Sequence, residues 1–394
     1  MNTLSLYINM KNSGFLEEEI HKSILDSIKT NFPTVNLEIF LISYQSIQYT
    51  ERNIKNYIDA SLFLGVPFLS EFIQYIIINY SYSNILSKYK DIESFLTDIR
   101  WMYSIVTDNK ILEISRNVEI KYISAYNNQK VTDKSISKLK SLIYLDIRYN
   151  ESVSDLSVKN LVSLKILKIS DKITDKSLIK LTNLEELYNC YNCKITDKSI
   201  KELTNLRVLD ISCNKYITDK SISCLSQIEE LSISFNNNIS DKSINCLRNL
   251  KYLDMVYNEK ITDYSVGKLT ELRGLVASNT KLTDSCLFTL KNLSKLETSI
   301  YMSDKGLKSL ANLSFLNISY NHKITDEAIL CMNNLKHLEA RGDIQISDTS
   351  VKSLDKLTYL DATNNEKITD ESIKSLKSLV MLKSYMNKNI TISV

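Results

Sequence analysis

The 394-residue sequence is poor in glycine and proline, with six Gly and two Pro in the whole chain. Tight glycine turns and flexible or proline-rich linkers are therefore scarce. Histidine is also rare, at His21, His322 and His337 only. Metal sites and catalytic centres that use several histidines consequently have few candidate residues.

Strong net charge and membrane-spanning runs are missing as well. The formal net charge is +3 with bases and acids interleaved, so we expect no nucleic-acid partner. The N-terminus has no basic n-region, and the most apolar run, residues 60–80, contains Pro67, Glu71 and Gln74. We therefore expect neither a signal peptide nor a membrane helix. Seven irregularly placed cysteines favour a reducing compartment, hence a cytoplasmic location with the nucleus as alternative.

The sequence does contain a repeat of 22 residues. An Asp preceded by Ser or Thr recurs twelve times, and eight of the eleven intervals are 22 residues, the others 20 or 21. A second pattern, L-x-x-L-x-L-x-x-N, keeps the same interval from Ile120 to Leu379 and marks thirteen units. A fixed period of this length indicates a solenoid, in which each unit buries its apolar face against its neighbours.

Each unit begins with a predicted strand that is buried on one face. In the unit LRVLDISCN, Leu209 and Ile211 alternate with Asp210 and Ser212, which is the period of a β-strand. Asn214 ends this strand, and Asn ends the strand in most other units. We expect a column of Asn amides to satisfy the backbone groups of adjoining turns.

The phrase ITD predicts the start of a helix of about two turns. The Ser or Thr before each Asp is a preferred N-cap, worth about 1 kcal/mol, and the Asp complements the helix dipole. Ile200 and Leu203 are expected to face inward, and the Lys and Ser of ITDKSI to lie on the convex side. Calcium is a poor alternative for the Asp residues, because calcium-binding repeats need glycines that this chain lacks.

The pattern LDIS-x-N-x-x-ITD-x-S-I-x-x-L resembles leucine-rich repeats over residues 115–394, most closely those of F-box/leucine-rich-repeat proteins. The short unit and its Asn also resemble internalin-type repeats. The resemblance implies an α/β solenoid of about 13 repeats of 20–22 residues. Its curved parallel sheet would form the concave side and short helices the convex side.

The first 110 residues lack this period. Residues 1–80, through His21–Leu25 and Leu37–Tyr44, resemble a divergent, mainly helical BTB/POZ domain that lacks the strand and helix usual between these pieces. An F-box over residues 16–28 and an unrelated helical cap are the alternatives. Residues 81–114 are expected to form a helical linker that covers the edge of the first strand.

Other patterns that could carry chemistry fit packing better. Cys190-x-x-Cys193 is half of a zinc or redox motif without its second half. The sequence has no phosphate-binding loop, G-x-S-x-G motif, H-E-x-x-H motif or dinucleotide fingerprint, and His337 has no nucleophile partner at a compatible spacing. We therefore expect no enzymatic activity, no metal and no cofactor.

The remaining candidate is the concave face of the predicted sheet. Acids prevail in the row that follows the inward Leu, and aromatics prevail in a second row at the strand ends. Aromatic anchors with a polar rim are typical of protein-binding surfaces. The alternative is that the rings only pack on one another. The candidate partner-binding residues are Asp146, Tyr149, Tyr188, Tyr191, Asp210, Phe235, Asp254, Tyr257, Tyr320 and Asp361.

The sequence thus predicts a non-catalytic protein-interaction scaffold. The resemblance of the N-terminal residues implies a substrate-recognition adaptor of a cullin–RING ubiquitin ligase, bound to a cullin directly or through a Skp1-like protein. A plain leucine-rich repeat binding protein is the alternative. In two irregular units, Thr280 and Tyr301 replace the Asn and Gly274 interrupts the strand, which predicts a local change of curvature.

Overall fold

The computed structural model describes residues 97–100, 106–116, 118–189, 194–342 and 344–392. The chain divides into two compact units, Met1–Ala125 and Tyr126–Val394. The predicted BTB/POZ-like or F-box-like segment, Tyr191 and the Cys190-x-x-Cys193 pair lie outside the described residues. Within the described ranges, no helix is long and apolar enough to cross a membrane.

The described part of the first unit contains helix α8 (Asp108–Ile114) and strand β1 (Tyr122–Ser124). A helix is therefore present in the predicted linker, but an extended segment pairs with β1. The N–H of Ile99 donates to the carbonyl of Tyr122 at 2.9 Å, and the N–H of Lys121 donates to the carbonyl of Thr97 at 2.8 Å. Residues 97–99 thus pair with one edge of this strand through a parallel bridge between Asp98 and Tyr122, and the preceding part of the predicted linker lies outside the described residues.

The second unit contains a continuous parallel sheet whose strands pair in chain order. The middle Leu residues stand in register, as Leu209 with Leu231 in β5 and β6, and both are buried. The strands are β2 (Tyr144–Asp146), β3 (Ile166–Lys168), β4 (Glu186–Tyr188), β5 (Val208–Asp210), β6 (Glu230–Ser232), β7 (Tyr252–Asp254), β8 (Gly274–Val276), β9 (Lys295–Glu297), β10 (Phe315–Asn317), β11 (His337–Glu339), β12 (Tyr359–Asp361) and β13 (Met381–Lys383).

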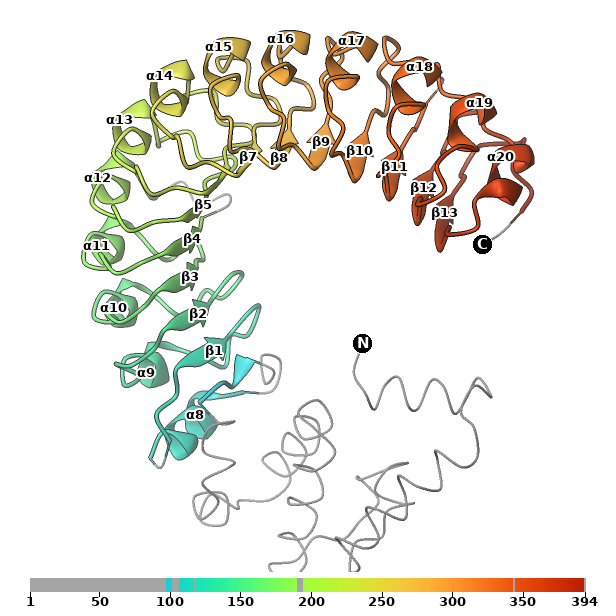
Figure 1. The fold of residues 1–394 in the computed structure, drawn as a ribbon. Helices are drawn as coiled ribbons and strands as arrows, with labels where there is room; N and C mark the ends of the chain where they lie inside the picture. The colour runs from blue at the N-terminus through green and yellow to red at the C-terminus, as the bar shows by residue number, and fades with distance from the viewer. Residues whose placement is uncertain (1–96, 101–105, 117, 190–193, 343, 393–394) are drawn as a thin grey trace, which may run out of the picture. The chain divides into compact units, whose positions relative to one another are not determined.

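A short helix follows each strand but the last. The helices are α9 (Asp133–Ile136), which precedes β2, α10 (Asp155–Val158), α11 (Asp175–Leu178), α12 (Asp197–Ile200), α13 (Asp219–Ile222), α14 (Asp241–Ile244), α15 (Asp263–Val266), α16 (Asp284–Leu287), α17 (Asp304–Leu307), α18 (Asp326–Ile329), α19 (Asp348–Val351) and α20 (Asp370–Ser375). Figure 1 shows the strands of this unit along the inner side of an arc and the helices along the outer side. The predicted leucine-rich repeat solenoid fold is confirmed.

Helices α9–α19 have four residues each, about one turn, and α20 has six, so the prediction of two turns is wrong for all but the last. After α12 the backbone bonds connect residues three apart: the N–H of Leu203 donates to Ile200, and that of Leu206 to Leu203, both at 3.1 Å. These three apolar residues are fully buried. Because they recur every third position, the tighter three-residue turn keeps all of them on the core side, where an α-helix would rotate them away.

The Asn column is confirmed. The amide of Asn258 donates to the carbonyls of Asn236 and Ile239 in the preceding repeat, at 2.7 and 3.1 Å. Its Oδ1 accepts the N–H groups of Lys260 and Ile261. Each buried amide thus satisfies backbone groups of two adjoining turns. The buried members are Asn128, Asn150, Asn214, Asn236, Asn258, Asn321, Asn365 and Asn387.

The Asp of ITD connects neighbouring repeats. Oδ1 of Asp197 accepts the N–H of Thr218 at 2.8 Å and the hydroxyl of Ser221 at 2.6 Å, while Oδ2 accepts the hydroxyl of Thr218 at 2.6 Å. Thr218 also caps α13, since its Oγ1 accepts the N–H of Lys220 at 3.2 Å. Ser221 lies in α13 on the convex side (Figure 1), as predicted, but it is fully buried, because the carboxylate of the preceding repeat binds it inside.

The irregular units adjust the Asn column in two ways. At Thr280 the hydroxyl donates within its own repeat, to the carbonyl of Ala277 at 2.7 Å. In the next unit Ser299, rather than the predicted Tyr301, takes the Asn position: it is buried, donates to the carbonyl of Leu282 and accepts the N–H of Tyr301. The shorter loop of this unit shifts the alignment by two residues. The change of curvature stays a prediction.

Candidate protein-binding surface

The concave face of the second unit presents two columns of side chains. The first column holds the first residue of each strand and the second column holds the third, while the Leu between them is buried. A third set, which we call the edge row, lies just beyond the strand ends. Its members other than glycine, beyond the ends of β2–β13, are Tyr149, Cys213, Phe235, Tyr257, Asn279, Tyr320, Asn364 and Met386.

The edge row has left-handed backbone geometry. The φ angles of these eight residues lie between 56° and 63°. The N–H of Asn214 donates to the carbonyl of Ile211 at 3.1 Å, which places Cys213 third in a four-residue turn. A positive φ at that position is typical of a type II turn and favours Gly or Asn. The turn directs the next residue, Asn214, into the buried Asn column.

Four of these eight edge-row residues are nevertheless aromatic. The exposed fractions of Tyr149, Phe235, Tyr257 and Tyr320 are 65, 54, 48 and 61%. Phe235 and Tyr257 stack with their ring centroids 4.7 Å apart. The rings therefore do pack on one another in part, as the alternative interpretation proposed, but about half or more of each side chain remains accessible.

Two predicted acids of the second column are buried. Asp146 is 3% exposed and Asp361 is 1% exposed, so neither carboxylate lies at the surface where a partner could bind it. Asp146 instead binds Arg148, with Nη2 to Oδ2 at 2.7 Å, and Asp361 binds Nε of Arg341 at 2.8 Å. The two arginines, which the sequence interpretation missed, are the partly exposed groups at these places.

The other predicted residues of the second column lie at the surface. Tyr188, Asp210 and Asp254 are partly exposed. The hydroxyl of Tyr188 donates to Oε2 of Glu186 at 3.0 Å, and burial together with this bond raises the pKa of Tyr188. Burial, followed by Asp254 and other carboxylates, raises the pKa of Tyr252 to about 12.

The first column contains an aromatic stack that the sequence interpretation did not identify. The ring of His337 lies between Phe315 and Tyr359, with centroid distances of 4.2 and 3.9 Å. Lys295 extends the stack, with Nζ 4.9 Å from the Phe315 centroid and 5.5 Å from that of Tyr252. The repeat pattern already shows that Phe315, His337 and Tyr359 occupy the same position of successive units. Only the strand register shows that their rings are neighbours.

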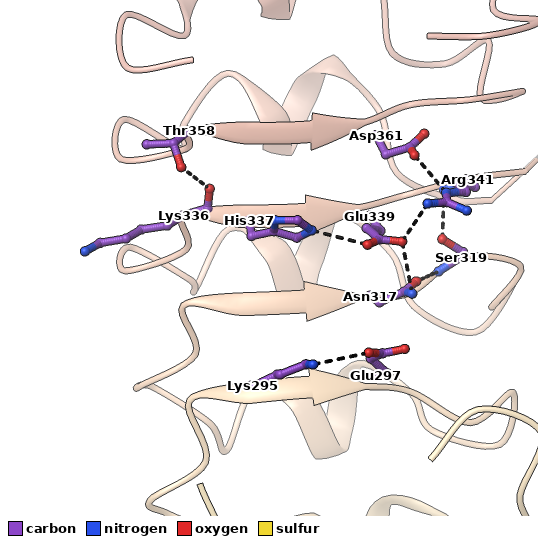
Figure 2. Close-up of polar contacts among 10 residues, drawn as sticks. All are labelled: Lys295, Glu297, Asn317, Ser319, Lys336, His337, Glu339, Arg341, Thr358 and Asp361. Atoms are coloured by element: carbon purple, nitrogen blue, oxygen red, sulfur yellow. Dashed lines mark hydrogen bonds and ion pairs between the residues drawn. The ribbon is translucent and has the colours of Figure 1, made fainter. Parts of the chain in front are cut away.

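A polar network lies beside this stack, as Figure 2 shows. Glu339 accepts from Nδ2 of Asn317 at 3.2 Å and pairs with Arg341 at 3.0 Å and with His337 at 3.3 Å. On β9, burial raises the pKa of Glu297, although the neighbouring charge of Lys295 acts to lower that pKa. These groups are bound to one another, so the network fixes the shape of the face over β9–β12.

In the described part of the chain, no group of three His, Cys, Asp or Glu residues is placed so that it could hold a metal ion. Cys224, Cys246 and Cys331 are exposed and Cys286 is buried. Burial, followed by the carboxylate of Asp263, raises the pKa of the Cys286 thiol, so this group stays a neutral thiol and packs as a small apolar residue.

Comparison with known proteins supports the repeat assignment. The family model described as "Leucine Rich repeat" matches residues 202–226 and 309–332. No curated protein matches the chain.

Two solved structures are among those to which this chain is similar. One is the Rad7 and Elc1 complex in yeast, in which the similar chain has 18% identity and a TM-score of 0.58, over 88% of this chain and 95% of that one. The other is an internalin, InlF, from Listeria monocytogenes, with 26% identity and a TM-score of 0.49, over 76% of this chain and 96% of that one. Leucine-rich repeats are thus present, and the yeast structure shares their fold.

Proposed function

We propose that this leucine-rich repeat protein is a non-catalytic scaffold that binds a protein partner on its concave face. The observation that carries the proposal is the edge row: aromatic side chains occupy backbone positions that favour Gly or Asn. An L-residue other than Gly, Asn or Asp in this conformation costs roughly 1–2 kcal/mol. The presence of four aromatics at such positions, with about half or more of their surface accessible, points to a role beyond folding.

The surroundings of the edge row suit protein binding. Rigid aromatic anchors give contact area at low entropic cost, and the neighbouring second column supplies polar groups such as Asp210 and Asp254. Arg148 and Arg341, each positioned by a buried carboxylate, add donors whose direction is fixed before a partner arrives.

The test is affinity capture from cells that express the protein, with two matched variants. The double variant Phe235→Ala/Tyr257→Ala removes concave aromatics, while Tyr264→Ala/Phe288→Ala removes exposed aromatics of the convex side. Proteins that the wild type captures should be lost from the first variant and kept by the second. Equal loss from both variants, or no loss from the first, would contradict the proposal.

A narrower version is that the protein is a substrate-recognition adaptor of a cullin–RING ubiquitin ligase. It is supported by the resemblance of residues 1–80 to BTB/POZ domains, with an F-box as the alternative, and of the repeats to those of F-box proteins. The full chain should then form a complex with a purified cullin of the BTB-binding type or with Skp1 in size-exclusion chromatography. Binding to neither would leave the plain leucine-rich repeat binding protein.

A further inference from the structure

The charge on the concave face is unevenly distributed, with carboxylates concentrated on strands β4–β7. Glu186 and Glu230 lie in the first column, and Asp210 and Asp254 in the second. The other residues of these two columns are Tyr188, Val208, Ser232 and Tyr252, so no Lys or Arg is among them. We call this area the β4–β7 face.

The four carboxylates form no ion pair with any described residue. Asp210 accepts the N–H of Ser212 at Oδ1, at 3.0 Å. Asp254 accepts the hydroxyl of Ser234, also at Oδ1. Both second carboxylate oxygens are left without a partner in the described part of the chain. Glu230 accepts no hydrogen bond there and is exposed.

Cations lie close to the β4–β7 face, but none of the described ones forms an ion pair with its four carboxylates. On one side, Arg207 and Lys251 both pair with Glu229, at 2.9 and 2.5 Å. Lys168, on β3, has its Nζ 4.6 Å from the centroid of the Tyr188 ring. Lys295, on β9, pairs with Glu297 at 3.6 Å. Lys168 and Lys295 thus lie against Tyr188 and Tyr252 at the two ends of the face, while its four carboxylates keep no ion-paired cation among the described residues.

An apolar contact surface adjoins these carboxylates. The stacked pair of Phe235 and Tyr257 extends from the ends of β6 and β7, with 54 and 48% of the side chains exposed. Ser212, Ser234 and Val256 lie between the two areas and carry no charge. The face thus combines four carboxylates without ion pairs with an exposed aromatic pair along one side.

We propose that the β4–β7 face binds an extended segment of a partner protein that carries at least two Lys or Arg side chains and one apolar residue. This proposal rests on the proposed function and names the chemistry of its partner. Glu186 and Glu230 are two strands apart, about 10 Å, and an extended chain repeats a side chain on one side every 7 Å or so. The long side chains of Lys or Arg can span the gap between the roughly 7 Å spacing of the segment and the roughly 10 Å spacing of the two glutamates. The apolar residue of the segment contacts Phe235 and Tyr257.

Charge excludes the other common occupants. A nucleic acid or an anionic membrane would bring phosphates against four carboxylates, which is repulsive. A second copy of this unit would present the same acids to each other in a two-fold contact of this face. A basic partner is the one class whose charge complements the surface.

The experiment measures binding of fluorescein-labelled peptides to the full chain by fluorescence polarisation. The probe is a twelve-residue peptide of alternating Arg and Ser with a central Phe, and the matched peptides carry Gln or Glu in place of Arg. Only the Arg peptide should bind, and its affinity should fall as salt is raised. The variant Glu186→Gln/Glu230→Gln should bind it roughly tenfold more weakly, because two exposed ion pairs are lost.

The control is Glu327→Gln/Glu371→Gln, which removes two exposed glutamates of the convex helices α18 and α20. This control changes the net charge by the same amount as Glu186→Gln/Glu230→Gln. Its affinity for the Arg peptide should stay within about twofold of the wild-type affinity. A single Glu230→Lys variant, tested for an unchanged melting temperature, should weaken binding further by repulsion. Equal affinity for the Arg and Gln peptides, or equal loss in the control, would overturn the proposal.

This outcome is distinguishable from failure of the proposed function. If the Arg peptide does not bind but partner capture still depends on Phe235 and Tyr257, the basic segment is wrong and the scaffold role stands. If capture is also unaffected by the two aromatics, both proposals fail.

Discussion

At the scale of single residues, the edge row shows a conflict between local backbone preference and side-chain type. Phe235 has a φ of 60° and Tyr257 a φ of 59°, in a turn that Gly would adopt without strain. The sequence alone shows aromatics at a repeated position. It does not show that their backbone is left-handed, because the turn arises from the next Asn entering the core.

This strain can be measured by comparing two truncations of the same residue. Phe235→Gly and Phe235→Ala both remove the ring, so they differ mainly in backbone preference. We expect the Gly variant to be more stable than the Ala variant by about 1 kcal/mol, measured by urea denaturation. At Ser232, in a regular strand, the order should reverse, since Gly weakens a strand.

Asp348, one of the Asp residues between repeats, makes stability depend on pH. Asp348 accepts the N–H and hydroxyl of Thr369 at 2.8 and 2.6 Å. Burial alone would raise the pKa of Asp348, but hydrogen bonds from Ser372 and Thr369 outweigh it and lower the pKa. Below the unfolded-state pKa of about 3.9, the unfolded chain binds more protons than the folded one. This contribution is therefore complete above about pH 5 and is lost as pH falls through the folded-state pKa.

Asp348→Asn should separate this contribution from general acid effects. At pH 7 the variant should be about 1–3 kcal/mol less stable, because charged hydrogen bonds are weakened. The difference from the wild type should shrink as the pH is lowered to 3, measured as urea midpoints across the range. A difference that is constant with pH would mean that this carboxylate is not a charged acceptor.

At the scale of the elements, the Asn column replaces the hydrogen bonds that longer strands would supply. Three-residue strands leave many turn groups inside the protein, and the buried amide of Asn258 binds four of them. Asn258→Ala should lower the free energy of unfolding by about 3 kcal/mol or more, since buried backbone groups lose their partners.

Asn249 is the matched control for this prediction. It lies at the surface and its amide makes one hydrogen bond, to the carbonyl of Ser226 at 3.1 Å. Asn249→Ala should cost about 1 kcal/mol or less. If both substitutions had the same effect in chemical denaturation, the column would not be a main source of stability.

The elements also show which features the sequence could predict. The strands and the N-caps were predicted correctly, because both depend on residues that are close in sequence. The strand follows from the alternation around Leu209, and the N-cap from the Ser or Thr before each Asp. The partners of Asp197 are 21 and 24 residues away, so local pattern could not reveal them. The two-turn helix was wrong because apolar spacing of three fits a tighter turn.

At the scale of the whole second unit, stacking of repeats converts one sequence position into one column of the surface. The candidate residues Tyr149, Phe235, Tyr257 and Tyr320 therefore could be predicted as an exposed set from period alone. The burial of Asp146 and Asp361 could not be predicted in this way, because each acid binds an arginine at a different spacing. Arg148 lies two residues after Asp146, whereas Arg341 reaches Asp361 from the preceding repeat.

The measurement that tests the central claim most directly is site-specific photo-crosslinking in cells. A photoreactive phenylalanine analogue at Tyr257 would report on the concave edge, and the same analogue at Tyr264 on the convex side, where 64% of that side chain is exposed. We expect a discrete cross-linked protein species from Tyr257 and none from Tyr264. Cross-linking from Tyr264 alone, or the same species from both positions, would contradict the claim.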